Sequence, residues 1–389
     1  MQIVQSLQKR GFTTYLVGGC VRDLLLKRQP KDFDIATNAH PRDVKRAISH
    51  SFIIGKRFRL VLVKRGDVQY EVSTFRRDPT PEELASEETP VGDNIFGSPE
   101  EDARRRDFTI NALFYDPSQK RIIDYAEGLR DLEKGTVKMI GDPEIRLQED
   151  PIRILRGIRL AHMIRFSLDS DLRAAIEKYS SSLQKTALPR RREELLKFLR
   201  LDNPALPFLT SLDLGALDAL SPTLARILRD TSKSEMFLAH IFAFHDKKLD
   251  TPLELFAGLV TAYFLTMNNG ELPKSMRTND ILENEHYQKF MRDELGMFKH
   301  EQSTVAKALH LMTLFLKRSE FENRGERRRA ALLANEAFPL SLKLAEREHW
   351  LSASDLHFWS SEFKKYTPAS RPPAHRRHRR RPKKPNPSS

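Results

Sequence analysis

The first 140 residues alternate runs in which every second residue is apolar with segments that carry apolar residues at helical spacing. The alternating runs predict strands at 13–17, 32–37 and 59–75, the last being two strands joined by a turn at 65–67. The helical spacing predicts helices at 3–10, 21–27 and 41–49. This part of the chain is therefore predicted to be a mixed α+β domain.

From about residue 148 onward, helical spacing replaces the strand pattern and predicts an all-α region. Before it, residues 79–104 are acidic, contain proline and have no clear period, which is typical of a mobile loop. The predicted organisation is a head at 1–145, a helical neck at 146–200, an all-α body at 201–345, a C-terminal helical segment at 346–370 and a tail at 371–389.

The composition fits a globular protein without a membrane span. Hydrophobic residues make up 39% and charged residues 31%, and the apolar runs are far shorter than the ~20 residues a membrane helix needs. The N-terminus has no apolar core of signal-peptide length, and the single cysteine, Cys20, agrees with a reducing compartment. We therefore expect a cytoplasmic protein without membrane insertion.

The positive charge is concentrated at the C-terminus. Residues 371–389 are proline-rich and hold eight Lys or Arg and no acid, more than half of the formal net charge of +13. Such a segment cannot bury enough apolar surface to fold, so we expect a disordered arm that attracts a polyanion, with a solubilising tail as the alternative. The side chains predicted to contact RNA are Arg376, Arg377, Arg379, Arg380, Arg381, Lys383 and Lys384.

Against this positive charge, the stretch KDFDIATN places two aspartates one residue apart. In a strand Asp32 and Asp34 would point to the same side, about 7 Å apart, and would either repel or share a cation. Glu71 is expected to add a third carboxylate from a neighbouring strand. An acidic pair at a turn with no such role is the alternative reading of the two aspartates alone.

A glycine pair precedes the aspartates. Gly18 and Gly19 end one predicted strand and begin a helix with Arg22 in its first turn, so backbone N–H groups and a cation would form a phosphate cradle. The alternative is an ordinary strand-to-helix turn with Arg22 and Asp23 in solvent. A phosphate cradle beside carboxylates that hold two metal ions predicts nucleotidyl transfer.

Four motifs extend these observations into a family resemblance. LVGGCVRDLLLKRQPKDFDIATNAHP (16–41), RRDFTINALFYD (105–116), DYAEGLRDL (124–132) and EDPIRILRGIRLA (149–161) resemble, in order and spacing, class II nucleotidyltransferases. This branch holds the bacterial poly(A) polymerases and the tRNA CCA-adding enzymes. The resemblance implies a nucleotidyltransferase head with a mixed sheet, an RNA-binding helical body, two Mg²⁺ ions and ATP as a substrate.

The resemblance also implies roles for particular residues. The metal ligands would be Asp32, Asp34 and Glu71, and Asp107 would join them as a catalytic acid, although it could instead cap a helix begun by FTINALFY. The residues implied in nucleotide binding are Gly18, Gly19, Arg22, Asp23, Arg106, Asn111, Asp150, Arg153, Arg156 and Arg159.

The motif EDPIRILRGIR is the implied base reader. Pro151 suits the first position of a helix that Asp150 would cap, and the three arginines then recur every three residues along one face. In similar enzymes the matching Asp and Arg bond the Watson–Crick edge of the incoming base. Adenine and cytosine both present an amino donor beside a ring acceptor there, so one reader accepts both and rejects G and U.

Poly(A) addition is the reaction we expect, with CCA or partial CCA addition to tRNA as the alternative. The segment IIGKRFRLVLV (53–63) resembles the form found in poly(A) polymerases, with Leu62 replacing a common histidine, and DNIFGSPEEDARRRDF and the basic tail also favour it. A more remote alternative is an inactive RNA-binding protein of the same fold. The expected partners are RNA 3′ ends of mRNA, small RNA or tRNA; the sequence identifies no protein partner such as an RNA-degrading nuclease or an RNA chaperone.

Overall fold

The computed structural model describes residues 1–55, 60–66, 68–80, 83, 95–246 and 248–366. The chain divides into two compact units, Met1–Leu255 with Lys289–Gly296 and Phe256–Gln288 with Met297–Ser389. The predicted domain boundaries at 145, 200 and 345 fall inside these units and stay predictions. The predicted arm at 371–389 with its RNA-binding residues Arg376 to Lys384, and most of the predicted loop at 79–104, lie outside the described residues.

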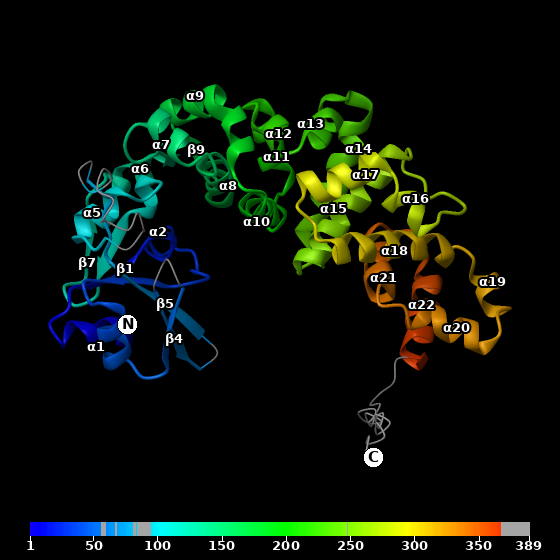
Figure 1. Cartoon of the computed structure of the whole chain (residues 1–389), viewed down its shortest axis with the longest axis horizontal. Helices are drawn as coiled ribbons and strands as arrows, with labels where there is room; N and C mark the ends of the chain where they lie inside the picture. The colour runs from blue at the N-terminus through cyan, green and yellow to red at the C-terminus, as the bar shows by residue number, and fades with distance from the viewer. Residues whose placement is uncertain (56–59, 67, 81–82, 84–94, 247, 367–389) are drawn as a thin grey trace, which may run out of the picture. The chain divides into compact units, whose positions relative to one another are not determined.

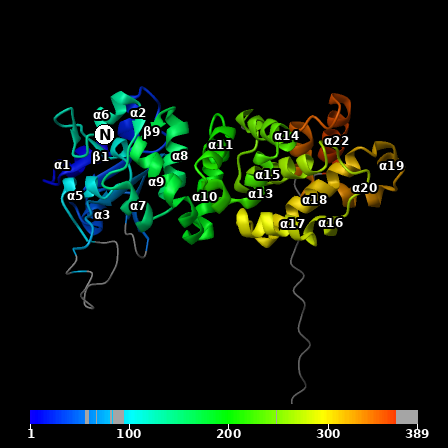
Figure 2. The ribbon, with the colours of Figure 1, turned by 90° about the horizontal axis from the view of Figure 1, so that it is seen from above.

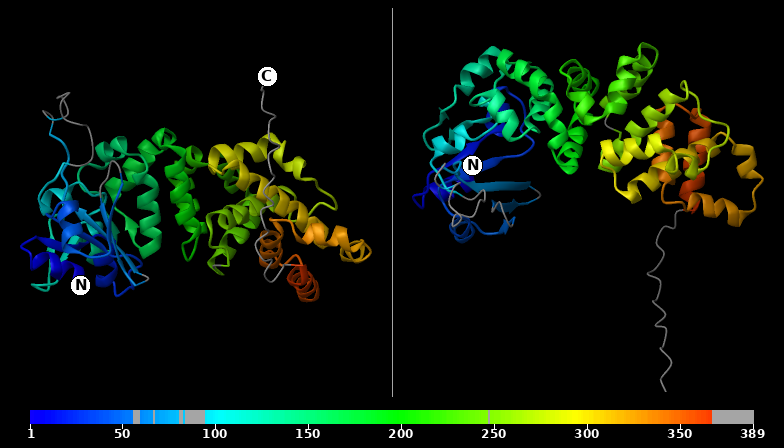
Figure 3. Two further views of the ribbon diagram at one scale, coloured as in Figure 1. Left: turned by 60° about the horizontal axis from the view of Figure 1, so that its bottom comes forward. Right: turned by 45° about the horizontal axis from the view of Figure 1, so that its top comes forward.

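A seven-stranded mixed sheet forms the N-terminal part of the first unit (Figures 1 and 3). Its strands are β1 (Thr14–Val17), β2 (Asp34–Thr37), β3 (Ser51–Ile54), β4 (Leu60–Arg65), β5 (Val68–Thr74), β6 (Leu113–Asp116) and β7 (Arg121–Asp124). Their order is β3-β4-β5-β2-β1-β6-β7, and β2 and β5 pair in parallel while the other pairs are antiparallel. The predicted α+β head is confirmed, although Asp32 lies just before β2 instead of within it.

Helices flank this sheet and bury apolar side chains against it. They are α1 (Gln2–Gln8), α2 (Gly19–Leu25), α3 (Pro41–Ala47), α5 (Pro99–Arg104) and α6 (Gly128–Lys134). One core cluster joins α1 and α3 to the face of the sheet that carries Ile35, Val61 and Val72, each at most 1% exposed. The opposite face of these strands is the one to which Asp34 belongs, since adjacent residues of a strand alternate sides.

Two sequence expectations are wrong here. Residues 98–104, placed in a mobile loop, contain α5, which Ser98 caps through a reciprocal capping box with Glu101. FTINALFY does not begin a helix, because one 3₁₀ turn (Thr109–Asn111) leads straight into β6.

The rest of the first unit is helical apart from one short parallel pair, β8 (Thr136–Val137) with β9 (Ser167–Leu168). Its helices are α7 (Pro143–Glu149), α8 (Arg153–Ile164), α9 (Ser170–Tyr179), α10 (Leu188–Leu199), α11 (Ala205–Asp213), α12 (Ala216–Leu220), α13 (Pro222–Arg229) and α14 (Thr231–Phe242). The predicted change from strands to helices near residue 148 is confirmed.

The second unit is also helical. After α15 (Pro252–Met267), which begins in the first unit, come α16 (Thr278–Leu282), α17 (Glu285–Gln288), α18 (Lys299–Phe315), α19 (Arg318–Glu322), α20 (Glu326–Leu333), α21 (Phe338–Arg347) and α22 (Ala353–Tyr366). Figure 2 shows α20 beside α22. Trp359 is fully buried against the rings of Phe315 and Phe321 and donates from Nε1 to the Phe315 carbonyl at 3.2 Å. No helix within the described ranges is both long and apolar enough to cross a membrane.

The motif DYAEGLRDL holds α6 against the 3₁₀ turn of the head. The Asp124 carboxylate accepts the backbone N–H groups of Gly128 at 3.0 Å and Leu129 at 2.9 Å, and the buried Asp131 accepts the Thr109 hydroxyl at 2.7 Å. A Cβ on Gly128 would lie 2.3 Å from the carbonyl oxygen of Thr109, so the close approach requires glycine.

Gly128→Ala is therefore expected to lower the free energy of unfolding by about 3 kcal/mol, because the new methyl group meets backbone that cannot rotate away. Gly325→Ala is the matched control, since a Cβ there meets nothing within 4 Å and the expected change is at most about 1 kcal/mol. Urea unfolding of the two variants and the parent chain measures both. Equal stability of the two variants would contradict the proposed close contact.

Candidate active site

Two carboxylates are placed side by side by the parallel pairing of β2 with β5. Asp34 and Glu71 are register partners, so their side chains share one face of the sheet, and Asp32 lies two residues before Asp34. Burial raises the pKa of Asp34, with Asp32 adding to the rise and Arg106 opposing it. Burial also raises the pKa of Glu71, and Asp34 and Asp32 raise it further. The three predicted metal ligands therefore form one repelling cluster.

This cluster suits hard divalent cations. Its donors are all carboxylate oxygens, the ligands Mg²⁺ prefers, and a bound cation would relieve the repulsion that raises the pKa of both Asp34 and Glu71. Among the described residues, no group of three or more His, Cys, Asp or Glu side chains is arranged so that it could hold a metal ion. The assignment of Asp32, Asp34 and Glu71 as metal ligands stays a prediction.

Arg106 lies next to the carboxylates and forms an ion pair with the buried Asp102. Its Nη2 donates to Asp102 Oδ2 at 2.9 Å, and a Cβ on Gly18 would lie 3.1 Å from its Nη1. Gly18 has a φ of +76°, so both its backbone conformation and this contact favour glycine. Asp102 also accepts from Arg105, at 3.0 Å.

Three of the predicted nucleotide-binding residues form a connected network beside the glycine pair. Arg22 is 4% exposed and donates from Nε and Nη2 to Asp23 Oδ1, at 2.9 and 2.7 Å, and from Nη1 to the side-chain oxygen of Asn111. Asn111 in turn donates from Nδ2 to Asp107 at 3.3 Å. The structure thus brings Asn111 to the adjacent pair Arg22 and Asp23, from which it is far away in the sequence.

Asp107 bonds to Arg156 on α8. Its Oδ2 accepts both Nε and Nη2 of Arg156, at 2.8 and 2.5 Å, and its Oδ1 accepts the backbone N–H of Phe108. Burial acts to raise the pKa of Asp107, but Arg156 and the hydrogen bonds from Arg156, Asn111 and Phe108 outweigh it and lower the pKa. Asp107 does not cap a helix, and its catalytic role stays a prediction.

The predicted base-reading aspartate has a partner that sequence reasoning missed. Asp150 does not cap α8: that helix begins at Arg153 after Ile152, and Asp150 ends α7. Its two carboxylate oxygens instead accept Nη1 and Nη2 of Arg190 on α10, at 2.8 and 2.9 Å. The only local signal for this pair is the cluster of three arginines at 190–192.

The other two predicted reader arginines are partly engaged within the protein. Arg153 donates to the backbone carbonyl of Arg146 at 2.7 Å and to Glu149 at 3.1 Å. Arg159 donates to the buried Glu194 at 2.7 Å. The face predicted for Arg153, Arg156 and Arg159 therefore both lines the site and attaches α8 to its surroundings.

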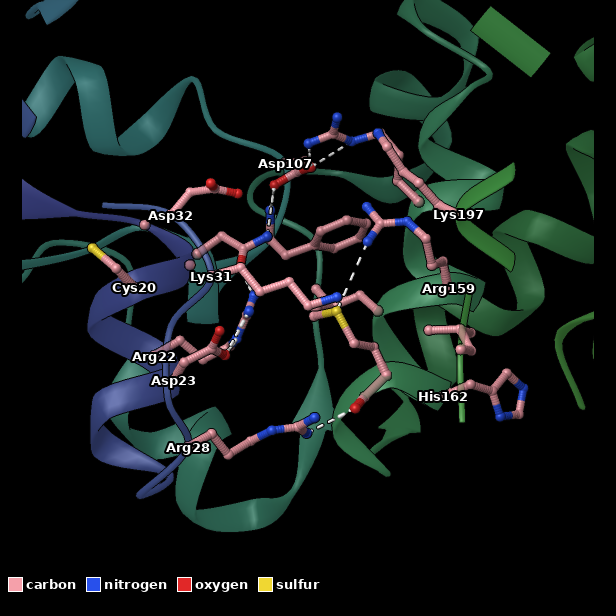
Figure 4. Close-up of a pocket in the computed structure, with 18 of the residues that line it drawn as sticks. Cys20, Arg22, Asp23, Arg28, Lys31, Asp32, Asp107, Arg159, His162 and Lys197 are labelled. Atoms are coloured by element: carbon pink, nitrogen blue, oxygen red, sulfur yellow. Dashed lines mark hydrogen bonds and ion pairs between the residues drawn. The ribbon is translucent and has the colours of Figure 1, made fainter. Parts of the chain in front are cut away.

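All the residues predicted to act in catalysis, metal binding or nucleotide binding, except Glu71, line one cavity of about 1390 Å³ in the first unit. Twelve lining residues are Lys or Arg and six are Asp, so the cavity favours anions. Figure 4 shows Arg22, Asp23 and Asp32 across the cavity from Arg159, His162 and Lys197. Basic lining residues not identified from the sequence are Arg28, Lys31, Arg105, Arg165, Arg190, Lys197 and Arg200.

A mixed sheet with paired carboxylates beside a glycine turn and a cation-lined cavity defines the class of nucleotidyltransferases. Comparison with known families matches residues 14–138 to the poly A polymerase head domain and residues 165–228 to a probable RNA and SrmB-binding site of polymerase A. The chain belongs to the family of bacterial poly(A) polymerases and CCA-adding enzymes.

Relatives of both kinds are similar to this chain. Poly(A) polymerase I of Haemophilus influenzae is 37% identical over 61% of this chain and 54% of its own length. The CCA-adding enzyme of Streptococcus uberis is 31% identical over 80% of this chain and 73% of its own length. The crystal structure of the Bacillus stearothermophilus CCA-adding enzyme in complex with CTP has the same fold, with a TM-score of 0.65, 24% identity, and coverage of 94% of this chain and 80% of that one. The chain spans about half the length of the poly(A) polymerases it matches.

Asp102→Asn is expected to lower the free energy of unfolding at pH 7 by about 3 kcal/mol, because it leaves the guanidinium groups of Arg105 and Arg106 without their buried anion. Burial opposes ionisation, but Arg106 and Arg105 outweigh it and hold the pKa of Asp102 below its ordinary value. Its charge therefore stabilises the fold above the unfolded pKa, and this contribution is lost as the pH falls through the lowered pKa.

Urea unfolding as a function of pH checks this prediction, and the difference between parent and variant should shrink toward acid pH. Glu100→Gln is the control on the same helix, since the Glu100–Arg104 pair is exposed and worth at most about 1 kcal/mol. A loss in Asp102→Asn that is the same at every pH would assign it to packing instead of charge.

Proposed function

We propose that this chain adds AMP from ATP to the 3′ ends of RNA without a template and releases pyrophosphate, as a poly(A) polymerase. The observation that carries the proposal is the pairing of Asp34 with Glu71, next to Asp32, at a cavity lined by twelve basic residues. Carboxylates that repel one another need cations, and a cation-lined cavity needs anions such as a triphosphate and RNA.

The division of roles follows from where the side chains lie. Asp32, Asp34 and Glu71 would hold two Mg²⁺ ions, which when bound lower the pKa of an attacking hydroxyl and stabilise the leaving pyrophosphate. Gly19 opens α2 and Arg22 lies one turn further, so this end of the cavity would hold the triphosphate. Arg106 offers a cation between the carboxylates and Asn111, with its Nη1 3.4 Å from the Asn111 carbonyl.

The base would be read on the neck side of the cavity. Asp150 accepts hydrogen bonds and Arg153 donates them, which matches the amino donor and ring acceptor that adenine and cytosine share. Arg190 would fix the orientation of Asp150 through its two hydrogen bonds. This reader separates A and C from G and U, so the choice between adding A and adding CCA depends on other parts of the chain.

Support for poly(A) addition comes from the similarity to poly(A) polymerase I at 37% identity and from the basic C-terminal segment. CCA addition to tRNA is the second candidate, because the CCA-adding relative is matched over a larger share of its own length, 73%. Both reactions need the same carboxylates and the same reader.

A direct assay separates the candidates. The full chain is incubated with Mg²⁺ and either an unstructured RNA or a tRNA lacking its CCA end, with ATP alone or with ATP and CTP. Long A tails on both RNAs are expected. Termination after CCA on tRNA would establish the second candidate, and RNA binding without any incorporation would indicate an inactive binding protein.

Asp34→Ala is expected to abolish Mg²⁺-dependent incorporation, at least a hundredfold, while RNA binding measured by filter retention stays near that of the parent chain. The physical reason is that the variant removes the most buried oxygen donor of the cluster but none of the cations that bind RNA. Incorporation that survives unchanged would overturn the metal assignment. Asp43→Ala serves as a control, since this aspartate is on α3 and does not line the cavity.

A further inference from the structure

The row of paired residues that contains Asp34 and Glu71 continues across the sheet into apolar residues. Glu71 on β5 is the register partner of Leu62 on β4, and Leu62 is the partner of Phe52 on β3. Because directly paired residues point to the same side of a sheet, Leu62 and Phe52 share the face of the two carboxylates. Ile54 and Leu60 form the next pair on the same face.

This face is covered on one side of Asp34 and open on the other. Toward β1 and β6, Asp34 pairs with Val17 and Val17 with Phe114, which are 1% and 0% exposed in a core cluster that also holds Phe75. Toward β3 the exposure rises, and Phe52 is 54% and Ile54 40% exposed.

The exposed residues are not a poorly packed part of the core. On the opposite face of β4, Val61 and Val63 are fully buried in the cluster that includes residues of α1 and α3, whereas Ile53 on the opposite face of the edge strand β3 is 37% exposed. The open face therefore carries its own apolar patch, defined here as the stacking shelf: Phe52, Ile54, Leu60 and Leu62. Lys64 follows two residues after Leu62 on the same side of β4 and is exposed.

We propose that the stacking shelf binds the unpaired bases at the 3′ end of the acceptor RNA. This inference rests on the proposed function, because the 3′-hydroxyl must reach the carboxylate cluster and the bases behind it must lie nearby. Strands are about 4.8 Å apart, so Phe52 is about 10 Å from the strand of Glu71, within the reach of a short single-stranded end. An exposed aromatic ring among aliphatic side chains offers any base a surface to stack on, and Lys64 offers a cation for a backbone phosphate.

A second copy of this chain is a less suitable occupant of the same surface. β3 is an edge strand, and an edge strand can pair with another copy. However, Lys64 and Arg65 end the neighbouring strand and are both exposed, and a chain with a net charge of +13 repels its own copies. The position of the shelf, in register with the carboxylates, favours RNA.

Fluorescence of a modified RNA tests the shelf without depending on catalysis. The probe is an unstructured oligonucleotide whose 3′-terminal base is 2-aminopurine, an adenine analogue that loses fluorescence when it stacks. With the full parent chain, in the absence of nucleotide, quenching on binding is expected. Phe52→Ala should restore fluorescence in the complex and weaken RNA binding about tenfold.

Three further variants sharpen the result. Phe52→Tyr should keep the quenching because it keeps the ring, and Ile54→Ala should show a smaller loss than Phe52→Ala. Phe242→Ala is the matched control, since Phe242 is 49% exposed on α14, outside the shelf. ATP binding, followed by equilibrium dialysis, should be the same in all of them.

Several results would overturn the inference. Unchanged quenching in Phe52→Ala would exclude stacking on the ring, and an equal loss in Phe242→Ala would indicate general loss of apolar surface. A concentration-dependent dimer of the parent chain that Phe52→Ala dissociates, with RNA binding unchanged, would assign the shelf to a second copy. These results can be distinguished from a failure of the proposed function. In that case the parent chain would not incorporate nucleotides, but the fluorescence result with the modified RNA would be unchanged.

Discussion

The parallel pairing of β2 with β5 is the constraint on which the site depends. It fixes Asp34 opposite Glu71 on a partly buried face. Burial raises the pKa of both carboxyl groups, Asp32 adds to the rise at Asp34, and Asp34 and Asp32 add to the rise at Glu71. Arg106 opposes this effect at Asp34, and Arg106 is itself held by the buried Asp102. The charges therefore alternate in sign from Asp34 to Arg106 to Asp102 to Arg105, so each ion stabilises the next.

Helices α7 and α8 complete the site and also hold it in place. Arg156 on α8 binds Asp107, and Arg146 on α7 donates to the carbonyls of Arg105 and Arg106 at 2.9 and 3.1 Å. On the other side, Arg28 of the head donates to the carbonyl of Met163 at 2.7 Å. Arg156, which is predicted to contact the nucleotide, is thus paired with Asp107, the predicted catalytic acid.

Local patterns predicted β1, β2, β4, β5 and the change to helices, because the spacing of apolar residues within a few adjacent positions is enough to predict each of them. β6 was missed because FTINALFY carries apolar residues at helical spacing, while its backbone extends to pair with β1 and β7. The Asp150–Arg190 pair joins residues 40 positions apart, one directly after α7 and one on α10, and no local pattern predicts such a contact. The motifs that resemble the family located most of the site, whereas the partners that orient it depend on tertiary packing.

The carboxylate cluster also bears on whether the chain is a catalyst or only a binding protein. Raised pKa values mean that ionised Asp34 and Glu71 destabilise the metal-free fold at neutral pH, since the unfolded chain ionises them more easily. RNA binding alone does not need this arrangement, because the twelve cations of the cavity attract phosphates and nearby acids weaken that attraction. The carboxylate cluster therefore lowers stability and opposes anion binding as long as no cations occupy it. Bound cations would remove both effects and would allow a hydroxyl and a triphosphate to approach each other.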